Sequence, residues 1–238
     1  MTDTYYAGVY WPGRPEPLES YARRAEILFQ RLASVDPSLT HWFEQATTRE
    51  AALKGRFTPD AGTLRGLLKK SKYQLGGGEI SFSAWNGEAE ASSVVNFSCG
   101  APSPSTVDLC LLTPPPQGPT AERILRASTL AQALRTMALA WEPSWGVITS
   151  DEHRDTVSEF ADVGTFVGWV TYLSHPRGAV PPLPAPVRVE PVEALGTLII
   201  LTPERFTVTN PEHVALAAQV REWLDHAGLL RPFHAAPS

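Results

Sequence analysis

The sequence has only two cysteines, Cys99 and Cys110, and neither belongs to a CxxC pair. Zinc sites built from cysteine and thioredoxin-like redox sites need such pairs, so the sequence excludes both kinds of site. We expect the two cysteines to be buried thiols on neighbouring strands. The chain also has no apolar run close to the roughly 18 residues of a membrane span, and residues 1–17 lack the basic and apolar regions of a signal peptide. These absences predict a cytoplasmic protein with no membrane partner.

Motifs for catalysis and cofactor binding are also missing. The glycines of LGGGE (75–79) are not followed by the GK[ST] of a phosphate-binding loop, so we interpret them as a turn. Ser174 and His175 are adjacent in LSHPR, and adjacent side chains on a strand point to opposite faces. The segment also lacks the GxSxG turn that exposes a nucleophilic serine. We therefore predict no catalytic residue, no cofactor and no enzymatic activity.

Positive charge is scarce in most of the chain. The formal net charge is −5, and residues 1–75 carry 11 basic and 8 acidic side chains, which leaves 9 basic and 17 acidic side chains for the rest. Proteins that bind nucleic acid directly usually show a basic stripe with aromatic platforms, so this charge balance argues against a nucleic-acid ligand. An acidic surface is instead compatible with a basic protein partner.

The first half of the chain predicts a strand, a helix and then a group of strands. Residues 5–11 are aromatic and β-branched, and apolar residues recur at helical spacing over 18–32. Residues 41–73 predict short helical pieces, with Thr47 or Thr48 and Asp60 as caps. After the glycines at 76–78, alternating runs around Asn86-Gly87 and over 105–113 predict an antiparallel meander.

The second half predicts a long helix over 121–141, capped by Thr120, a short strand or turn near 145–150, and strands over 166–173 and 195–202. The proline-dense segment 176–191 should be an extended surface connector. A final helix has Asn210 as its cap, Pro211 at its first position and Gly228 at its end, with an inward stripe of Val214, Ala217, Val220, Leu224 and Ala227. Strands and helices do not alternate regularly, which predicts an α+β fold in one domain (1–238), with a largely antiparallel or mixed sheet and packed amphipathic helices. The alternative is two lobes, 1–112 and 121–238, joined by the proline-rich connector 113–120.

The segment DEHRD (151–155) is the strongest candidate for a functional surface. With Glu159 and Asp162 it places five acids within twelve residues, but it has neither the HExxH spacing of a zinc site nor the acidic ladder of a calcium loop. A solvated acidic face is the simplest interpretation, and a protein-binding patch is the functional one. We predict no metal site. Most of the seven tryptophans should be core, and one or two exposed ones would be interface anchors.

Residues 5–44 and 196–230, together with WVTYLS (169–174), resemble the immunity protein 52 family of bacterial polymorphic toxin systems. The shared features are apolar patterns punctuated by tryptophan, proline, Asn-Pro and Gly-Leu-Leu. The resemblance implies a cytoplasmic α+β protein that is encoded beside a toxin and binds that toxin, thereby protecting the producing bacterium. It also implies toxins with restriction-endonuclease-like nuclease domains, and it supplies no catalytic residues.

An acidic inhibitor of a nuclease would use carboxylates to compete with phosphate and buried aromatic side chains to slow dissociation. The residues that we expect to contact the toxin are Asp151, Glu152, Asp155, Glu159, Asp162, Trp145, Trp169 and Tyr172. Trp169 and Tyr172 are three positions apart, so they should face opposite sides of a strand and at most one should be core. Two alternatives remain at this point: a hydrolase that uses His153 or His175, and an adaptor of a secretion system that binds without neutralising.

Overall fold

Eleven strands form one antiparallel sheet in residues 3–157 and 162–233, the parts of the chain that the computed structural model describes. The strands are β1 (Tyr5–Pro12), β2 (Trp42–Glu44), β3 (Arg56–Phe57), β4 (Gln74–Gly76), β5 (Glu79–Trp85), β6 (Val94–Cys99), β7 (Val107–Thr113), β8 (Trp145–Ser150), β9 (Val170–Ser174), β10 (Arg188–Val192) and β11 (Gly196–Ile200). Their order is β10-β11-β9-β8-β1-β7-β6-β5-β2-β3, and β4 pairs with β5.

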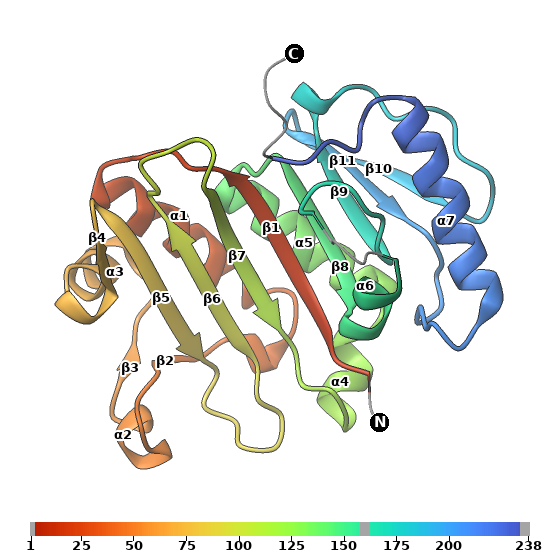
Figure 1. The fold of residues 1–238 in the computed structure, drawn as a ribbon. Helices are drawn as coiled ribbons and strands as arrows, with labels where there is room; N and C mark the ends of the chain where they lie inside the picture. The colour runs from red at the N-terminus through yellow and green to blue at the C-terminus, as the bar shows by residue number, and fades with distance from the viewer. Residues whose placement is uncertain (1–2, 158–161, 234–238) are drawn as a thin grey trace.

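Strand β1 lies at the centre of the sheet and joins its two parts (Figure 1). Tyr10 of β1 pairs with Leu109 of β7 on one side and with Trp145 of β8 on the other, both in antiparallel register. Strands from both sides of the connector 113–120 therefore belong to one sheet. The predicted α+β single-domain class with a largely antiparallel sheet is confirmed.

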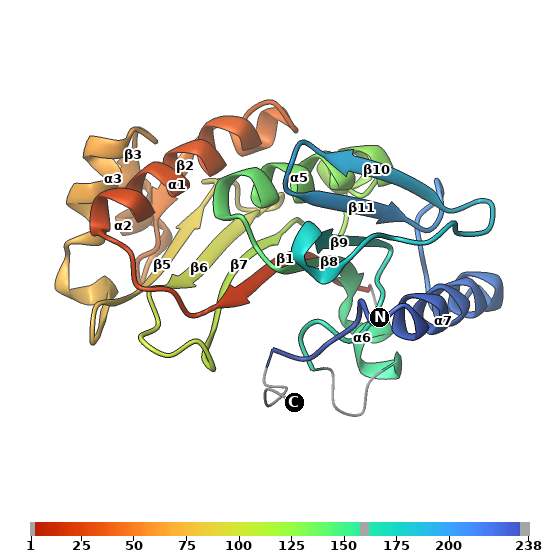
Figure 2. The same ribbon diagram turned by 90° about the horizontal axis from the view of Figure 1, so that it is seen from above.

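Helices cover the sheet unevenly. They are α1 (Leu18–Leu32), α2 (Arg49–Leu53), α3 (Ala61–Leu68), α4 (Pro119–Ile124), α5 (Ala127–Trp141), α6 (Asp151–Val157) and α7 (Pro211–His226). Helices α1 and α5 cover one face of the sheet, whereas α6 and α7 lie on the opposite face, over the part that contains β8 and β9 (Figures 1 and 2). That opposite face is open over β5, β6 and β7. No helix within the described parts is both long enough and apolar enough to cross a membrane.

The burial of successive residues follows this layering. Buried and half-buried residues alternate along β5, β6 and β7, as expected of strands with one covered and one open face, but every residue of β8 and β9 is buried. The core between sheet and helices is rich in aromatic rings. Trp141 of α5 stacks on Trp11 of β1 with ring centroids 5.1 Å apart, and it also contacts Phe97 of β6 at 5.0 Å. This packing fixes α5 against the centre of the sheet.

Local sequence signals account for several elements. Helix α1 covers the predicted range, and its buried residues Tyr21, Ala22, Ala25, Leu28, Phe29 and Leu32 belong to the predicted stripe. Thr48 and Asp60 cap α2 and α3, and Asn210 caps α7, because each side chain accepts a hydrogen bond from a backbone N–H in the first helical turn. The two cysteines are buried on the neighbouring strands β6 and β7 as free thiols, and burial raises the pKa of both.

Three predicted elements are wrong in detail. The long helix over 121–141 is two helices, because the chain leaves the helical conformation at Leu125 and Arg126, and Gly118 rather than Thr120 precedes the first of them. The region 41–73 contains the strands β2 and β3 in addition to helices. The proline-dense segment ends in β10, which tolerates Pro191 because it lies at the edge of the sheet.

Candidate functional site

Helix α6 carries three of the predicted acidic residues, Asp151, Glu152 and Asp155, on the surface of the molecule, and Asp162 lies beyond the end of the helix. The Ser150 hydroxyl accepts a hydrogen bond from the His153 N–H at 3.1 Å, as a helix cap does, and Asp151 and Glu152 follow in the first turn, where the helix dipole favours negative charge. Glu152, Asp155 and Asp162 are exposed and Asp151 is half-buried. Glu159 lies outside the described residues.

Arg154 neutralises part of this acidic segment. Its guanidinium pairs with the carboxylates of Asp151 at 3.0 Å and Asp155 at 2.8 Å, and it lies over the ring of Tyr6. Among the described residues, Glu152 and Asp162 form no ion pair within 4.0 Å. The surface therefore presents both paired and free carboxylates. Its negative electrostatic potential is weaker than the count of acidic residues in the sequence suggests.

His153 is the buried member of the acidic segment. Its Nε2 lies 3.0 Å from the Val167 carbonyl, and its ring packs edge-on against Phe206 with centroids 4.7 Å apart. Burial lowers the pKa of this imidazole. Within residues 3–157 and 162–233, no group of three or more histidine, cysteine, aspartate or glutamate side chains could hold a metal ion. His153 fixes α6 to the loop before α7 instead of reaching the surface.

The three aromatic residues expected at the interface are in the core. Trp145 and Trp169 are 0% exposed and Tyr172 is 1% exposed. The expectation that Trp169 or Tyr172 would be exposed is wrong, because β9 lies between β8 and β11 and both of its faces are covered. A partner that docks on the surface has no direct access to these rings.

Ser174 and His175, the residues of the alternative hydrolase reading, lie at the end of β9. Ser174 is buried and His175 is exposed at the start of a short 3₁₀ helix, His175–Arg177. In the described structure, the two side chains share no hydrogen bond, and His175 lies beyond the end of the strand. Their arrangement does not form a nucleophile and base pair.

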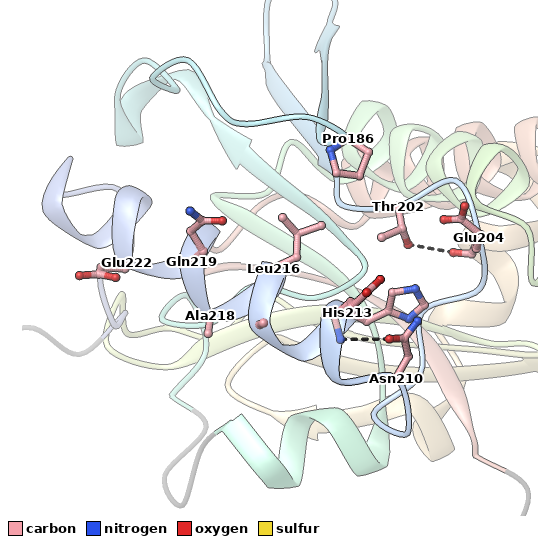
Figure 3. Close-up of a pocket in the computed structure, with 11 residues that line it drawn as sticks. Pro186, Thr202, Glu204, Asn210, His213, Leu216, Ala218, Gln219 and Glu222 are labelled. Carbon is pink, nitrogen blue, oxygen red and sulfur yellow. Dashed lines mark hydrogen bonds between the residues drawn. The ribbon is translucent and has the colours of Figure 1, made fainter.

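An open groove beside α7 was not predicted from the sequence. It has a volume of about 990 Å³ and lies between α7 and the segments that contain Pro186 and Thr202. Figure 3 shows Glu204 near one end and Glu222 near the other, with Leu216 and Pro186 between them. His213, which is only 9% exposed, also lines the groove. The groove combines apolar walls with three carboxylates, those of Glu204, Glu212 and Glu222.

The sequence held a partial signal for this groove. The predicted inward stripe of the last helix is correct for Ala217, Val220 and Leu224, but His213 is buried where Val214 was expected, and Ala227 is exposed. Helix α7 is therefore rotated slightly relative to the prediction. Trp223 is 39% exposed, whereas the other six tryptophans are buried or half-buried, and it lies seven residues after Leu216, two helical turns along the same side.

Comparisons with known proteins place the chain in a family. Its sequence matches the family described as Immunity protein 52 over residues 3–233. No curated protein matches the sequence. Among solved structures, the fold is similar to that of the Pseudomonas aeruginosa T6SS protein PA0821, with a TM-score of 0.54 and 16% sequence identity over 93% of this chain and 76% of that chain. At this identity the likeness concerns the fold alone, but the family match covers nearly the whole chain. The chain belongs to the Immunity protein 52 family, a family of immunity proteins of toxin systems.

Proposed function

We propose that the protein acts in the cytoplasm as a stoichiometric inhibitor: it binds a toxin encoded beside it and thereby protects the bacterium that produces both. The observation that carries this proposal is the match to an immunity-protein family over residues 3–233. The described surface supports it, because the exposed carboxylates of α6 and the groove beside α7 are features through which a protein partner can be bound.

The toxin, in this proposal, is a nuclease of the restriction-endonuclease-like class. The support is the resemblance described above, together with the acidic surface of α6. A nuclease binds a polyanion, so its substrate-binding surface is basic, and exposed carboxylates such as Glu152, Asp155 and Asp162 complement such a surface. Exposed carboxylates increase the rate of association by electrostatic attraction, and they compete with phosphate for the same cations.

Co-expression with the product of the adjacent gene tests this function. We expect the protein to restore growth of cells that produce the toxin and to co-purify with it as a stable complex. Growth without a complex would favour an enzyme that destroys the toxin or its product. A complex without growth would favour an adaptor that binds the toxin without neutralising it.

A further inference from the structure

The groove beside α7 is acidic and contains no cation. The carboxylates of Glu204, Glu212 and Glu222 line it, and within residues 3–157 and 162–233 none of the three forms an ion pair within 4.0 Å. Three arginines, Arg126, Arg188 and Arg205, line a separate hollow that shares Pro186 with the groove. The negative charge of the groove is therefore not balanced by residues of its own walls.

An apolar stripe runs along the same side of α7. Leu216 lines the groove, and Trp223 follows two turns later with 39% of its surface exposed. The side chains of Ala215, Ala218 and Gln219, which also line the groove, are exposed and are small or uncharged. Exposed tryptophans beside such a hollow are the residues that most often carry binding energy at protein interfaces.

His213 adds a hydrogen-bond donor with no partner in the described structure. Its Nδ1 accepts a hydrogen bond from the Thr207 N–H at 3.1 Å, so in the neutral imidazole the proton is on Nε2. The ring stacks on Phe206 with centroids 5.3 Å apart, which fixes its orientation. His213 lines the groove with 9% of its surface exposed, so a molecule that enters the groove can accept the hydrogen bond that Nε2–H does not make to the described residues.

We propose that the groove receives a positively charged segment of the toxin, with Trp223 and Leu216 contacting an apolar side chain of that segment. Lysine or arginine side chains of the segment pair with Glu204, Glu212 and Glu222, and a backbone carbonyl accepts the hydrogen bond from His213 Nε2. This inference rests on the proposed function and specifies where the toxin is bound. Helices α6 and α7 cover the same face of the sheet, so one interface of ordinary size can include both (Figure 1).

The test compares the binding of groove variants to the catalytically inactive product of the adjacent gene. We expect Trp223→Ala to raise the dissociation constant of the complex by at least about 10-fold. The double variant Glu204→Lys with Glu222→Lys should lower the association rate about 10-fold at low salt and reduce its dependence on salt. The matched control, Glu88→Lys with Glu90→Lys, makes the same charge change in the loop between β5 and β6, far along the sheet, and should bind like the unmodified protein.

Ala218→Arg gives an independent result if Trp223→Ala affects folding. Ala218 is exposed on α7 and arginine is a good helix former, so this variant should fold while placing a cation in the groove, and it should also bind more weakly. Unchanged binding by all groove variants would overturn this inference and leave the proposed function intact. A change in the protein's own oligomeric state with unchanged toxin affinity would also overturn it, because the occupant would be a second copy. Failure of the unmodified protein to bind would overturn both proposals.

Discussion

The side chain of Trp169 connects the residues just before β9 with the residues just after β11. Its indole N–H donates a hydrogen bond to the Thr202 carbonyl at 2.9 Å, and its ring meets Tyr5 of β1 edge-on at 6.0 Å. The side chain is fully buried, so it contributes both packing and a satisfied polar group to the core where β1 and β9 begin.

Replacing Trp169 tests its place in the core. We expect Trp169→Ala to lower the free energy of unfolding by about 3–5 kcal/mol, because the substitution leaves a cavity and removes the donor to Thr202. Trp223→Ala on the surface should cost less than about 1 kcal/mol. Urea denaturation of both variants measures the difference, and equal losses would show that the assignment of core and surface tryptophans is wrong.

His153 makes stability depend on pH. Burial lowers the pKa of the native imidazole, so below pH 6.5, the usual value of the unfolded side chain, the unfolded chain binds a proton that the native protein does not. Stability should therefore decrease as the pH falls from about 7 toward 5, with a contribution of at most about 1.4 kcal/mol per pH unit. Urea titrations at several pH values should show a smaller decrease for His153→Gln, which retains a donor for the Val167 carbonyl. An identical decrease in both proteins would refute this role.

At the scale of elements, Arg177 connects the chain that follows α7 to the sheet. Its guanidinium donates hydrogen bonds to the carbonyls of Ser144, Gly164, Leu229 and Arg231, at 3.1 to 3.3 Å. Burial, with the nearby charge of Arg231, lowers the pKa of Arg177 to about 10. A charged donor shared by four backbone carbonyls holds three separate segments together.

Removing this donor should release the C-terminal segment. In Arg177→Met, we expect a loss of about 1.5–3 kcal/mol in stability and faster hydrogen exchange of the amides in residues 229–233. The comparison is Arg231→Met, which removes only one hydrogen bond, to the Arg177 carbonyl. Equal exchange rates in Arg177→Met and the unmodified protein would contradict the anchoring role.

Elements with a strong local signal could be predicted from the sequence. Helix α1 follows from its apolar spacing, and the start of α7 follows from Asn210 and Pro211, because capping is decided by neighbouring residues. The sequence could not show that β9 is covered on both faces, since this depends on β8 and β11 as neighbours and on helices from other parts of the chain. Trp169 and Tyr172 were misplaced for that reason.

The candidate site could be predicted from the sequence only where it is formed by residues close together in the chain. The exposed carboxylates of α6 follow from a run of charge in the sequence, but their pairing with Arg154 depends on the geometry of the helix. The groove requires Pro186 and Thr202 to lie beside α7, which are contacts between distant segments. The spacing in the sequence places Leu216 and Trp223 on the same side of α7, but it could not show that Pro186 and Thr202 form the opposite wall of the groove.

At the scale of the whole molecule, the two faces of the sheet differ in how they are covered. Helices α1 and α5 bury one face, whereas α6 and α7 add charged and apolar features to one part of the other (Figures 1 and 2). Both covered regions contribute to the core, and we propose that the side with α6 and α7 also provides the surface that contacts the toxin.

Charge reversal at two acidic residues of α6 and at Asp162, beyond its end, tests this assignment through kinetics. We expect Glu152→Lys, Asp155→Lys and Asp162→Lys together to lower the association rate with the toxin about 10-fold at low salt, and less at high salt, because exposed charges are screened. The triple variant keeps the Asp151–Arg154 ion pair. Stopped-flow measurements against salt concentration give the result, and the same rate and salt dependence as the unmodified protein would exclude these carboxylates from the interface.

The central claim is that the protein neutralises its toxin by forming a stoichiometric complex. The most direct measurement is a titration of the activity of the proposed toxin, assayed as a nuclease, with increasing amounts of the purified protein. We predict that activity falls linearly and is abolished at about one equivalent. Complete loss of activity at a small fraction of an equivalent would indicate turnover by an enzyme, and full activity in the presence of excess protein would contradict inhibition.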